Sequence, residues 1–240
     1  MIYVMSDIHG NFENFESVME QINLKPEDRL YILGDVIDRH PYGLLILQKL
    51  MKMGNVQMVL GNHEYMMMEA LGFPYQKAKR RGQSPILRND LLDLWYSNGG
   101  DVTHCLWEYM SSKAQSDIVD YLSSLPLNID LDVSGRKFKL VHAAPSELYK
   151  EFGAEYDNEA EFAVWDRETI HICPELGYTV IFGHTPTLDF KRSDPLEIVE
   201  YNGWIGIDCG SGWGDLTAFG YPTGRLACLR LDDMKTFYSV

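Results

Sequence analysis

The sequence has few of the features that mark disulfide-rich, membrane-spanning or nucleic-acid-binding proteins. Its four cysteines show no CxxC spacing, so neither a zinc knuckle nor a disulfide framework is indicated. No apolar run approaches the roughly 20 residues that a membrane span needs, and residues 1–5 are too few for the core of a signal peptide. Lysine and arginine number 21 against 35 acidic residues, a formal net charge of −14 that argues against a nucleic-acid partner or a membrane surface. We therefore expect a cytoplasmic protein with neither kind of partner.

The length and composition are those of an ordinary globular domain. The chain has 240 residues, of which 45% are hydrophobic and 23% charged, enough for one large domain with a sizeable core. No linker, internal repeat or low-complexity segment divides it. We expect a single domain over residues 1–240, with a largely helical insertion at residues 65–125.

The first 65 residues repeat one unit three times, a short apolar strand followed by a polar turn and a helix. The strands are predicted at residues 1–5, 30–33 and 56–60, and the helices follow from apolar residues at helical spacing. This order indicates a parallel, doubly wound sheet. Beyond residue 126 the hydrophobic period shifts toward two, which predicts a hairpin over residues 127–141. Further strands are predicted at residues 178–182, 196–201, 204–207, 216–220, 225–230 and 235–238.

Polar and charged side chains follow five of these strands, at the point where each strand ends. The densest group lies in the stretch LYILGDVIDRH, where Asp35, Asp38 and Arg39 follow a buried strand. Charges at such a place are costly to desolvate unless metals or partners satisfy them, and ligands gather at the carboxyl ends of α/β strands. The other strand ends carry Asp7, His9, Asn62, His63, His142 and His184. Imidazole and carboxylate together suit divalent transition metals, so five such turns favour a shared metal site over solvated loops.

Five short motifs, in this order, resemble those of the calcineurin-like metallophosphoesterases: DIHG, GDVIDR, GNHE, the single His142 and GHT. The chain is most similar to the bacterial and phage type within the phosphoprotein phosphatase branch, and the likeness extends to about residue 230. The resemblance implies an α/β (α+β) fold, a two-sheet β-sandwich flanked by helices. It also implies two divalent metal ions at the strand ends, with manganese expected and iron or zinc as alternatives.

The resemblance implies a role for each residue at the strand ends. Six would hold the metals: Asp7 and His9 the first ion, Asp35 both ions as a bridge, and Asn62, His142 and His184 the second ion. His63 resembles the family's general acid, oriented by the carboxylate of Asp38. Arg39 resembles one phosphate-binding arginine, and Arg167 resembles the other, because it follows His142 by 25 positions in a Trp-x-Arg context.

These residues also meet the chemical demands of phosphate ester hydrolysis, whatever the family. Two cations a few ångströms apart acidify a bridging water and neutralise the charge that develops on phosphorus. An arginine guanidinium matches two phosphate oxygens, and a histidine held by a carboxylate can protonate the leaving alkoxide. We therefore expect a dinuclear metal-dependent phosphoesterase in which a metal-bridging hydroxide attacks phosphate monoesters.

Three functions remain open. The leading hypothesis is a serine/threonine protein phosphatase, whose substrate is a phosphorylated protein, peptide or small phosphoester. The second is a symmetrical diadenosine tetraphosphate hydrolase, for which Trp95, Tyr96 or Trp107 would stack the bases. The third is a metal-binding regulatory protein without turnover, although such proteins usually lose a ligand or the acid, and here all are present.

Two further features depart from the pattern. His40 stands where the family usually has glycine after the arginine, and it would either crowd the site or add a second acid. A single basic stretch within residues 77–88 contains Lys77, Lys79, Arg80, Arg81 and Arg88. Charge runs of this kind are usually solvated loops, and the alternative is that the stretch attracts acidic substrates.

Overall fold

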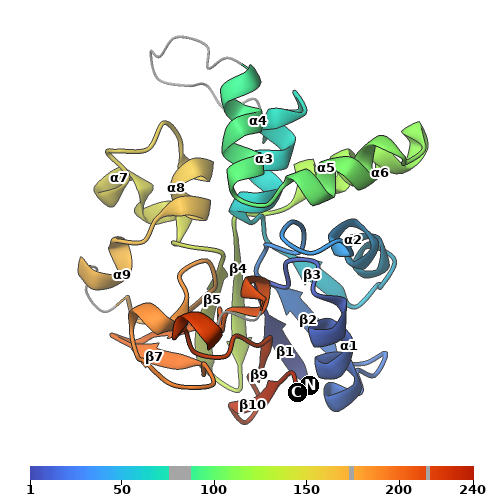
Figure 1. The fold of residues 1–240 in the computed structure, drawn as a ribbon. Helices are drawn as coiled ribbons and strands as arrows, with labels where there is room; N and C mark the ends of the chain where they lie inside the picture. Colours follow the sequence, from blue (N-terminus) through green and yellow to red (C-terminus); the bar gives the residue numbers. More distant parts are fainter. Residues whose placement is uncertain (76–87, 173–175, 215–216) are drawn as a thin grey trace.

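The computed structural model describes residues 1–75, 88–172, 176–214 and 217–240 (Figure 1). Two five-stranded sheets form its centre, and helices flank them. Four of the basic residues singled out in the sequence, Lys77, Lys79, Arg80 and Arg81, lie outside the described residues. No helix in the described ranges is long and apolar enough to cross a membrane.

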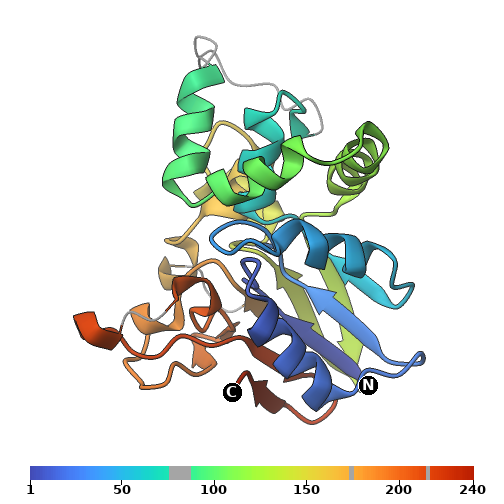
Figure 2. The ribbon, with the colours of Figure 1, turned by 45° about the vertical axis from the view of Figure 1, so that its right-hand side comes forward.

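The first sheet has the strand order β10-β9-β1-β2-β3. Strands β1 (Ile2–Met5), β2 (Arg29–Ile32) and β3 (Val56–Met58) run parallel, as the repeated unit in the sequence predicts. Strands β9 (Ala227–Arg230) and β10 (Lys235–Tyr238) extend the sheet in antiparallel orientation. The last strands of the chain therefore lie next to its first strand (Figure 2).

The second sheet has the order β4-β5-β6-β8-β7. Strands β4 (Asn128–Val133) and β5 (Arg136–Val141) form the predicted hairpin. Strands β6 (Thr179–Phe182) and β8 (Trp204–Gly206) run parallel to β5, and β7 (Val199–Tyr201) closes the sheet in antiparallel orientation. Parallel strands in both sheets thus bring several carboxyl ends together.

The alternation of side chains shows what covers each face of the first sheet. Leu30 and Ile32 pack into the core under the helices, whereas Tyr31 and Leu33 pack against residues of the second sheet such as Leu140. The prediction of a doubly wound sheet is therefore wrong, because a second sheet and not a second helix layer covers this face. The two-sheet sandwich flanked by helices that the resemblance implies is confirmed.

Helices α1 (Phe12–Ile22) and α2 (Gly43–Met51) cover the outer face of the first sheet with apolar side chains. Both views place four helices above the sheets: α3 (Asn62–Ala70), α4 (Arg88–Ser97), α5 (Asp101–Glu108) and α6 (Ser112–Ser124). The side of the second sheet carries α7 (Tyr149–Phe152), α8 (Glu159–Trp165) and α9 (Thr169–Ile172).

One predicted strand is absent from the described residues, the one expected at residues 216–220. A 3-10 helix, η5 (Thr217–Phe219), takes its place. Its residues are all exposed, and Phe219 is 78% exposed. The strand prediction is wrong here because residues 217–219 are exposed, so burial does not reward an extended backbone at these positions.

Candidate metal centre and active site

The strand ends of both sheets bring the predicted residues to one place. Asp7 and His9 follow β1, the group from Asp35 to Arg39 follows β2, and His142 follows β5. Asn62 and His63 begin α3 just beyond β3, and His184 follows β6. Eight of these side chains are at most 5% exposed: Asp7, His9, Asp35, Asp38, Asn62, His63, His142 and His184. Arg39 and Arg167 are the exposed members of the predicted set.

The backbone at these strand ends is held in an unfavourable conformation. Six residues there have a left-handed φ between 50° and 72°: Asp7, His9, Asp35, Asp38, Arg39 and His184. Each such non-glycine residue costs about 1–3 kcal/mol, so the surrounding structure must enforce the conformation. The strain is concentrated at this site, because only four other described non-glycine residues share a positive φ.

Glu64 is one of the contacts that enforce this conformation, and sequence reasoning assigned it no role. Its buried carboxylate accepts backbone N–H groups from Asp35 at 2.9 Å, Val36 at 2.9 Å and Ile37 at 3.4 Å. Burial and the charge of Asp35 raise the pKa of Glu64 to about 7, against the effect of these N–H donors. The signal was present in the sequence, since Glu64 is the last residue of the GNHE motif.

Three acceptor atoms converge in one half of the site. His142 donates its Nδ1 proton to the Leu33 carbonyl at 2.6 Å, and His184 donates its Nε2 proton to the Trp165 carbonyl at 3.2 Å. Burial lowers the pKa of both histidines, so each remaining ring nitrogen carries a lone pair. These nitrogens lie 2.8 and 2.9 Å from the same Oδ1 atom of Asn62. Acceptors this close repel one another unless a cation lies between them, so the donor set fits a divalent metal.

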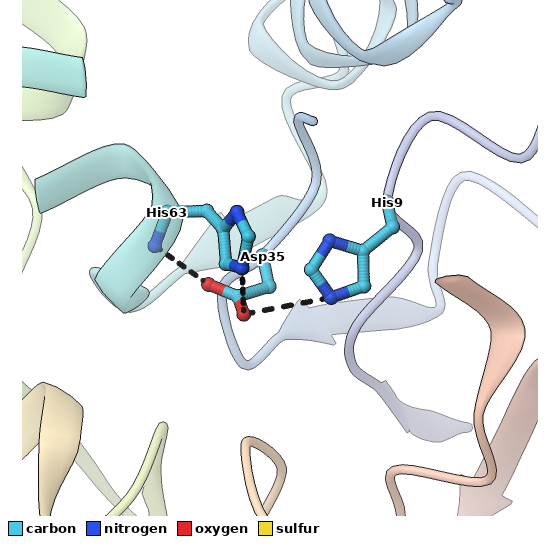
Figure 3. A group of neighbouring side chains, drawn as sticks. All are labelled: His9, Asp35 and His63. Atoms are coloured by element: carbon cyan, nitrogen blue, oxygen red, sulfur yellow. Dashed lines mark hydrogen bonds and ion pairs between the residues drawn. The ribbon is translucent and has the colours of Figure 1, made fainter. Parts of the chain in front are cut away.

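A second group of acceptors lies around Asp35 Oδ2, and Figure 3 shows the rings of His9 and His63 beside this oxygen. His9 gives its Nδ1 proton to the Ile37 carbonyl, and its Nε2 lies 3.6 Å from Asp35 Oδ2 and 3.9 Å from Asp7 Oδ1. The other oxygen of Asp35, Oδ1, lies 3.4 Å from His142 Nε2. These separations suit atoms that each lie about 2.0–2.2 Å from a shared cation. Asp35 therefore faces both groups, one through each oxygen.

Buried carboxylates give the site an excess of negative charge. Burial, followed by the charges of Asp208 and Asp35, raises the pKa of Asp7 well above its usual value. Burial also raises the pKa of Asp208, while His142 and His63 outweigh burial and lower the pKa of Asp35. No lysine or arginine of the described ranges forms an ion pair with any of the three. Divalent cations would supply the missing charge.

Asp208 is a second residue that sequence reasoning missed. It lies just beyond β8, at a sixth strand end, is 6% exposed, and accepts the Gly210 N–H at 2.9 Å. The rule that found the other residues applies to it as well, because the predicted strand at residues 204–207 ends at this aspartate. It went unnoticed because no imidazole or second carboxylate accompanies it in the sequence.

His63 differs from the other site histidines in its partner. Its Nδ1 donates to Asp38 Oδ2 at 2.7 Å, and its Nε2 lies 3.3 Å from an Arg39 Nη2. Burial would lower the pKa of His63, but the carboxylates of Asp35 and Asp38 outweigh it and raise the pKa. His63 Nε2 also lies 3.8 Å from Asp35 Oδ2, close enough for a metal ligand. His9, Asp35 and His63 thus form one group that could hold a metal ion, and Asp7 Oδ1, 3.9 Å from His9 Nε2, is an alternative third donor.

Arg167 and His40 lie at the margin of the site. Arg167 is exposed just beyond α8. The pKa of His184 is lowered by burial, by the charge of His142 and then by the charge of Arg167. Its neighbour Asp166 is buried and accepts the Thr169 N–H at 2.9 Å, which holds this turn. His40 is half-buried, and burial followed by the Arg39 charge lowers its pKa. The geometry thus leaves Arg167 and Arg39 accessible to a ligand over the buried centre.

A family model for calcineurin-like phosphoesterases matches residues 1–188. The chain belongs to this family. Phosphoester hydrolysis at a two-metal centre is therefore the chemistry of its family, and the resemblance seen in the motifs is confirmed.

Individual relatives of the chain carry the names of two different phosphoesterase activities. The chain is 35% identical over 94 residues to a symmetrical bis(5'-nucleosyl)-tetraphosphatase of Erwinia tasmaniensis, a match that covers 38% of this chain but only 34% of that protein. It is 28% identical to serine/threonine-protein phosphatase 2 of Salmonella typhimurium, over 76% of this chain and 78% of that protein. The crystal structure of a cold-active protein-tyrosine phosphatase from a psychrophilic Shewanella shares the fold, with a TM-score of 0.56 at 15% identity, covering 100% of this chain and 80% of that one.

The first prediction concerns Asp35, the side chain that faces both groups of acceptors. We expect Asp35→Asn to lose tight binding of at least one divalent ion and to lower turnover of p-nitrophenyl phosphate by several orders of magnitude. Elemental analysis of the purified variant and its rate measure both effects. Asp117→Asn on the exposed face of α6, where Asp117 pairs with Lys113, is the control. Two full equivalents of metal with a normal rate in Asp35→Asn would contradict a two-metal centre.

The second prediction concerns Glu64. In Glu64→Gln the side-chain NH₂ group faces a backbone N–H donor of the Asp35 loop, and a buried unpaired donor costs about 1–3 kcal/mol. We expect the free energy of unfolding to fall by about this amount in urea, and the affinity for divalent metal to fall with it. Glu16→Gln, which breaks only the surface ion pair with Lys49, should change stability by less than about 1 kcal/mol. Equal stability of both variants would show that the carboxylate does not hold the loop.

Proposed function

We propose that the chain is a dinuclear metal-dependent phosphomonoesterase that acts on phosphoserine or phosphothreonine in proteins. The observation that carries the proposal is the position of Asp35, whose two oxygens face two separate groups of buried acceptors. A single cation would leave one of these groups uncompensated, whereas two cations satisfy both.

The proposed metal ligands are those that the family pattern indicates. The first ion would bind Asp7, His9 and Asp35, and the second would bind Asp35, Asn62, His142 and His184. When bound, the two ions would acidify a water molecule for attack and neutralise charge on the phosphate oxygens. Manganese is the ion that the family resemblance leads us to expect, with iron or zinc as alternatives, because this set of imidazole, carboxylate and amide oxygen ligands suits divalent transition metals.

The protein's own contribution is to orient the phosphate and to protonate the leaving group. Arg39 and Arg167 are exposed beside the buried centre, and each guanidinium can bind two phosphate oxygens. His63 would donate its Nε2 proton to the departing alkoxide while Asp38 holds the opposite edge of the ring. The raised pKa of His63 supports this role, because an acid must carry its proton at the working pH.

The burial of two tryptophans favours the protein substrate over the dinucleotide. Trp95 is fully buried and Trp107 is 7% exposed, so neither offers a ring face on which a base can stack. Tyr96 is 40% exposed and is therefore the one residue of the three whose ring remains open to a base. The stacking platform expected for the alternative is therefore missing at Trp95 and Trp107. Symmetrical hydrolysis of diadenosine tetraphosphate remains the second candidate, because the Erwinia tasmaniensis relative carries that name.

A comparison of substrates tests the proposal directly. Phosphoserine and phosphothreonine peptides, p-nitrophenyl phosphate and diadenosine tetraphosphate would be assayed side by side with manganese present. We expect the highest kcat/KM for the phosphopeptides. A preference for diadenosine tetraphosphate would establish the alternative substrate. No turnover of any substrate by the metal-loaded protein would instead favour a non-catalytic regulatory role.

The role of His63 is tested with two substrates of nearly the same shape. Nitrophenolate leaves with little protonation, whereas phenolate needs a proton in the transition state. We expect His63→Asn to lower kcat for phenyl phosphate at least about 100-fold, and to affect p-nitrophenyl phosphate far less. Equal losses on both esters would show that His63 supports the metal site and is not the acid.

A further inference from the structure

The corner between α4 and α5 holds the segment that carries Asp38 and Arg39. The backbone N–H of Asp38 donates to Thr103 Oγ1 of α5 at 3.0 Å, and the N–H of Arg39 donates to the Gly99 carbonyl at 3.0 Å. Both Asp38 and Arg39 have a left-handed backbone, with φ of 72° and 65°. These two contacts therefore contribute to enforcing a conformation that the segment would not adopt alone.

The corner also reaches the Asp38 side chain through Trp95. The indole Nε1–H of Trp95 donates to Asp38 Oδ2 at 2.9 Å, and this same oxygen accepts the His63 Nδ1 proton at 2.7 Å. The other oxygen, Oδ1, is buried and accepts no hydrogen bond from the described residues. One oxygen thus binds two donors, and the asymmetry fixes the rotation of a carboxylate that is fully buried.

The Trp95 ring has little freedom to move from this position. It is 0% exposed, and Gly100 packs directly against its face, so a Cβ at position 100 would collide with the ring. Gly100 has an ordinary φ of −76°, so its backbone conformation does not require glycine. What requires glycine there is the space that the indole occupies. The glycine and the indole together hold the N–H aimed at Asp38.

We propose that Trp95 is a positioning residue for the general acid. By binding Asp38 Oδ2, the indole N–H holds the carboxylate in the one rotation that orients the His63 ring toward the leaving group. Without it only His63 binds Asp38, so either oxygen can accept the His63 proton, the carboxylate can rotate, and the His63 ring loses its fixed direction. This inference rests on the proposed role of His63 as proton donor. It assigns to α4 a role in positioning the proton donor, although this helix supplies none of the proposed metal ligands.

Trp95→Phe tests this directly, because it removes the N–H and keeps an aromatic ring in the same site. We expect kcat for phenyl phosphate to fall about tenfold, with p-nitrophenyl phosphate changed less than about twofold and both KM values unchanged. Trp107→Phe is the matched control, since Trp107 is also buried in this helical region and donates no hydrogen bond to Asp38. Its two rates should remain at the parent values.

Gly100→Ala provides a second disturbance that leaves the indole N–H intact. The added methyl group would push the ring away from Asp38, so we expect the same selective loss on phenyl phosphate. Equal slowing of both esters in Trp95→Phe and Gly100→Ala would overturn the proposal, because general damage to the fold does not depend on the leaving group.

A spectroscopic measurement tests the hydrogen bond without activity. The chain has five tryptophans, and Trp95→Phe identifies the Trp95 indole signal in a ¹H–¹⁵N spectrum. We expect Asp38→Asn to shift this signal more than the other four, and no shift would overturn the proposal.

His63→Asn, assayed on the same two esters, distinguishes a failure of the Trp95 inference from a failure of the proposed general acid. If His63→Asn is selective and Trp95→Phe is not, only the inference about Trp95 fails. If His63→Asn is not selective, the proposed acid fails first.

Discussion

Repulsion among buried acceptor atoms is the constraint on which the rest of this structure depends. Carboxylates from Asp7, Asp35 and Asp208 lie in one buried region, together with the Nε2 atoms of His9 and His142, whose Nδ1 atoms donate to backbone carbonyls. Such a cluster is unfavourable alone, and it becomes favourable when divalent cations neutralise it. We therefore expect metal binding and folding of this edge to be thermodynamically coupled.

The fold maintains this cluster through residues outside it, which hold the backbone of the site in its strained conformation. The loop after β2 is held by the Glu64 carboxylate of α3 and, at the corner between α4 and α5, by Thr103 and the Gly99 carbonyl. None of the residues that hold the loop, Glu64, Thr103 and Gly99, is a proposed metal ligand. The loop thus directs Asp35 toward both groups of buried acceptors while it directs Asp38 toward His63, so one short segment would serve both halves of the proposed chemistry.

The residues of the site could be predicted from the sequence far better than the packing around them. A strand end followed by aspartate or histidine is a local pattern, and the parallel order of β1 to β3 follows from repeated strand–turn–helix units. The doubly wound sheet was a wrong inference because those units do not reveal what covers the second face. The expectation that Trp95 and Trp107 stack bases was equally local, and their burial removes it.

By itself, the sequence determined which side chains are available at the strand ends, since periodicity and turn residues act over a few neighbours. It also determined the family, because the motifs keep their order along the chain. Only the tertiary structure decided that Asp208 from the sixth strand end joins the cluster and that Trp95 binds Asp38, 57 positions away. Contacts between distant segments depend on how the helices settle on the sheets, and no local pattern of residues encodes that packing.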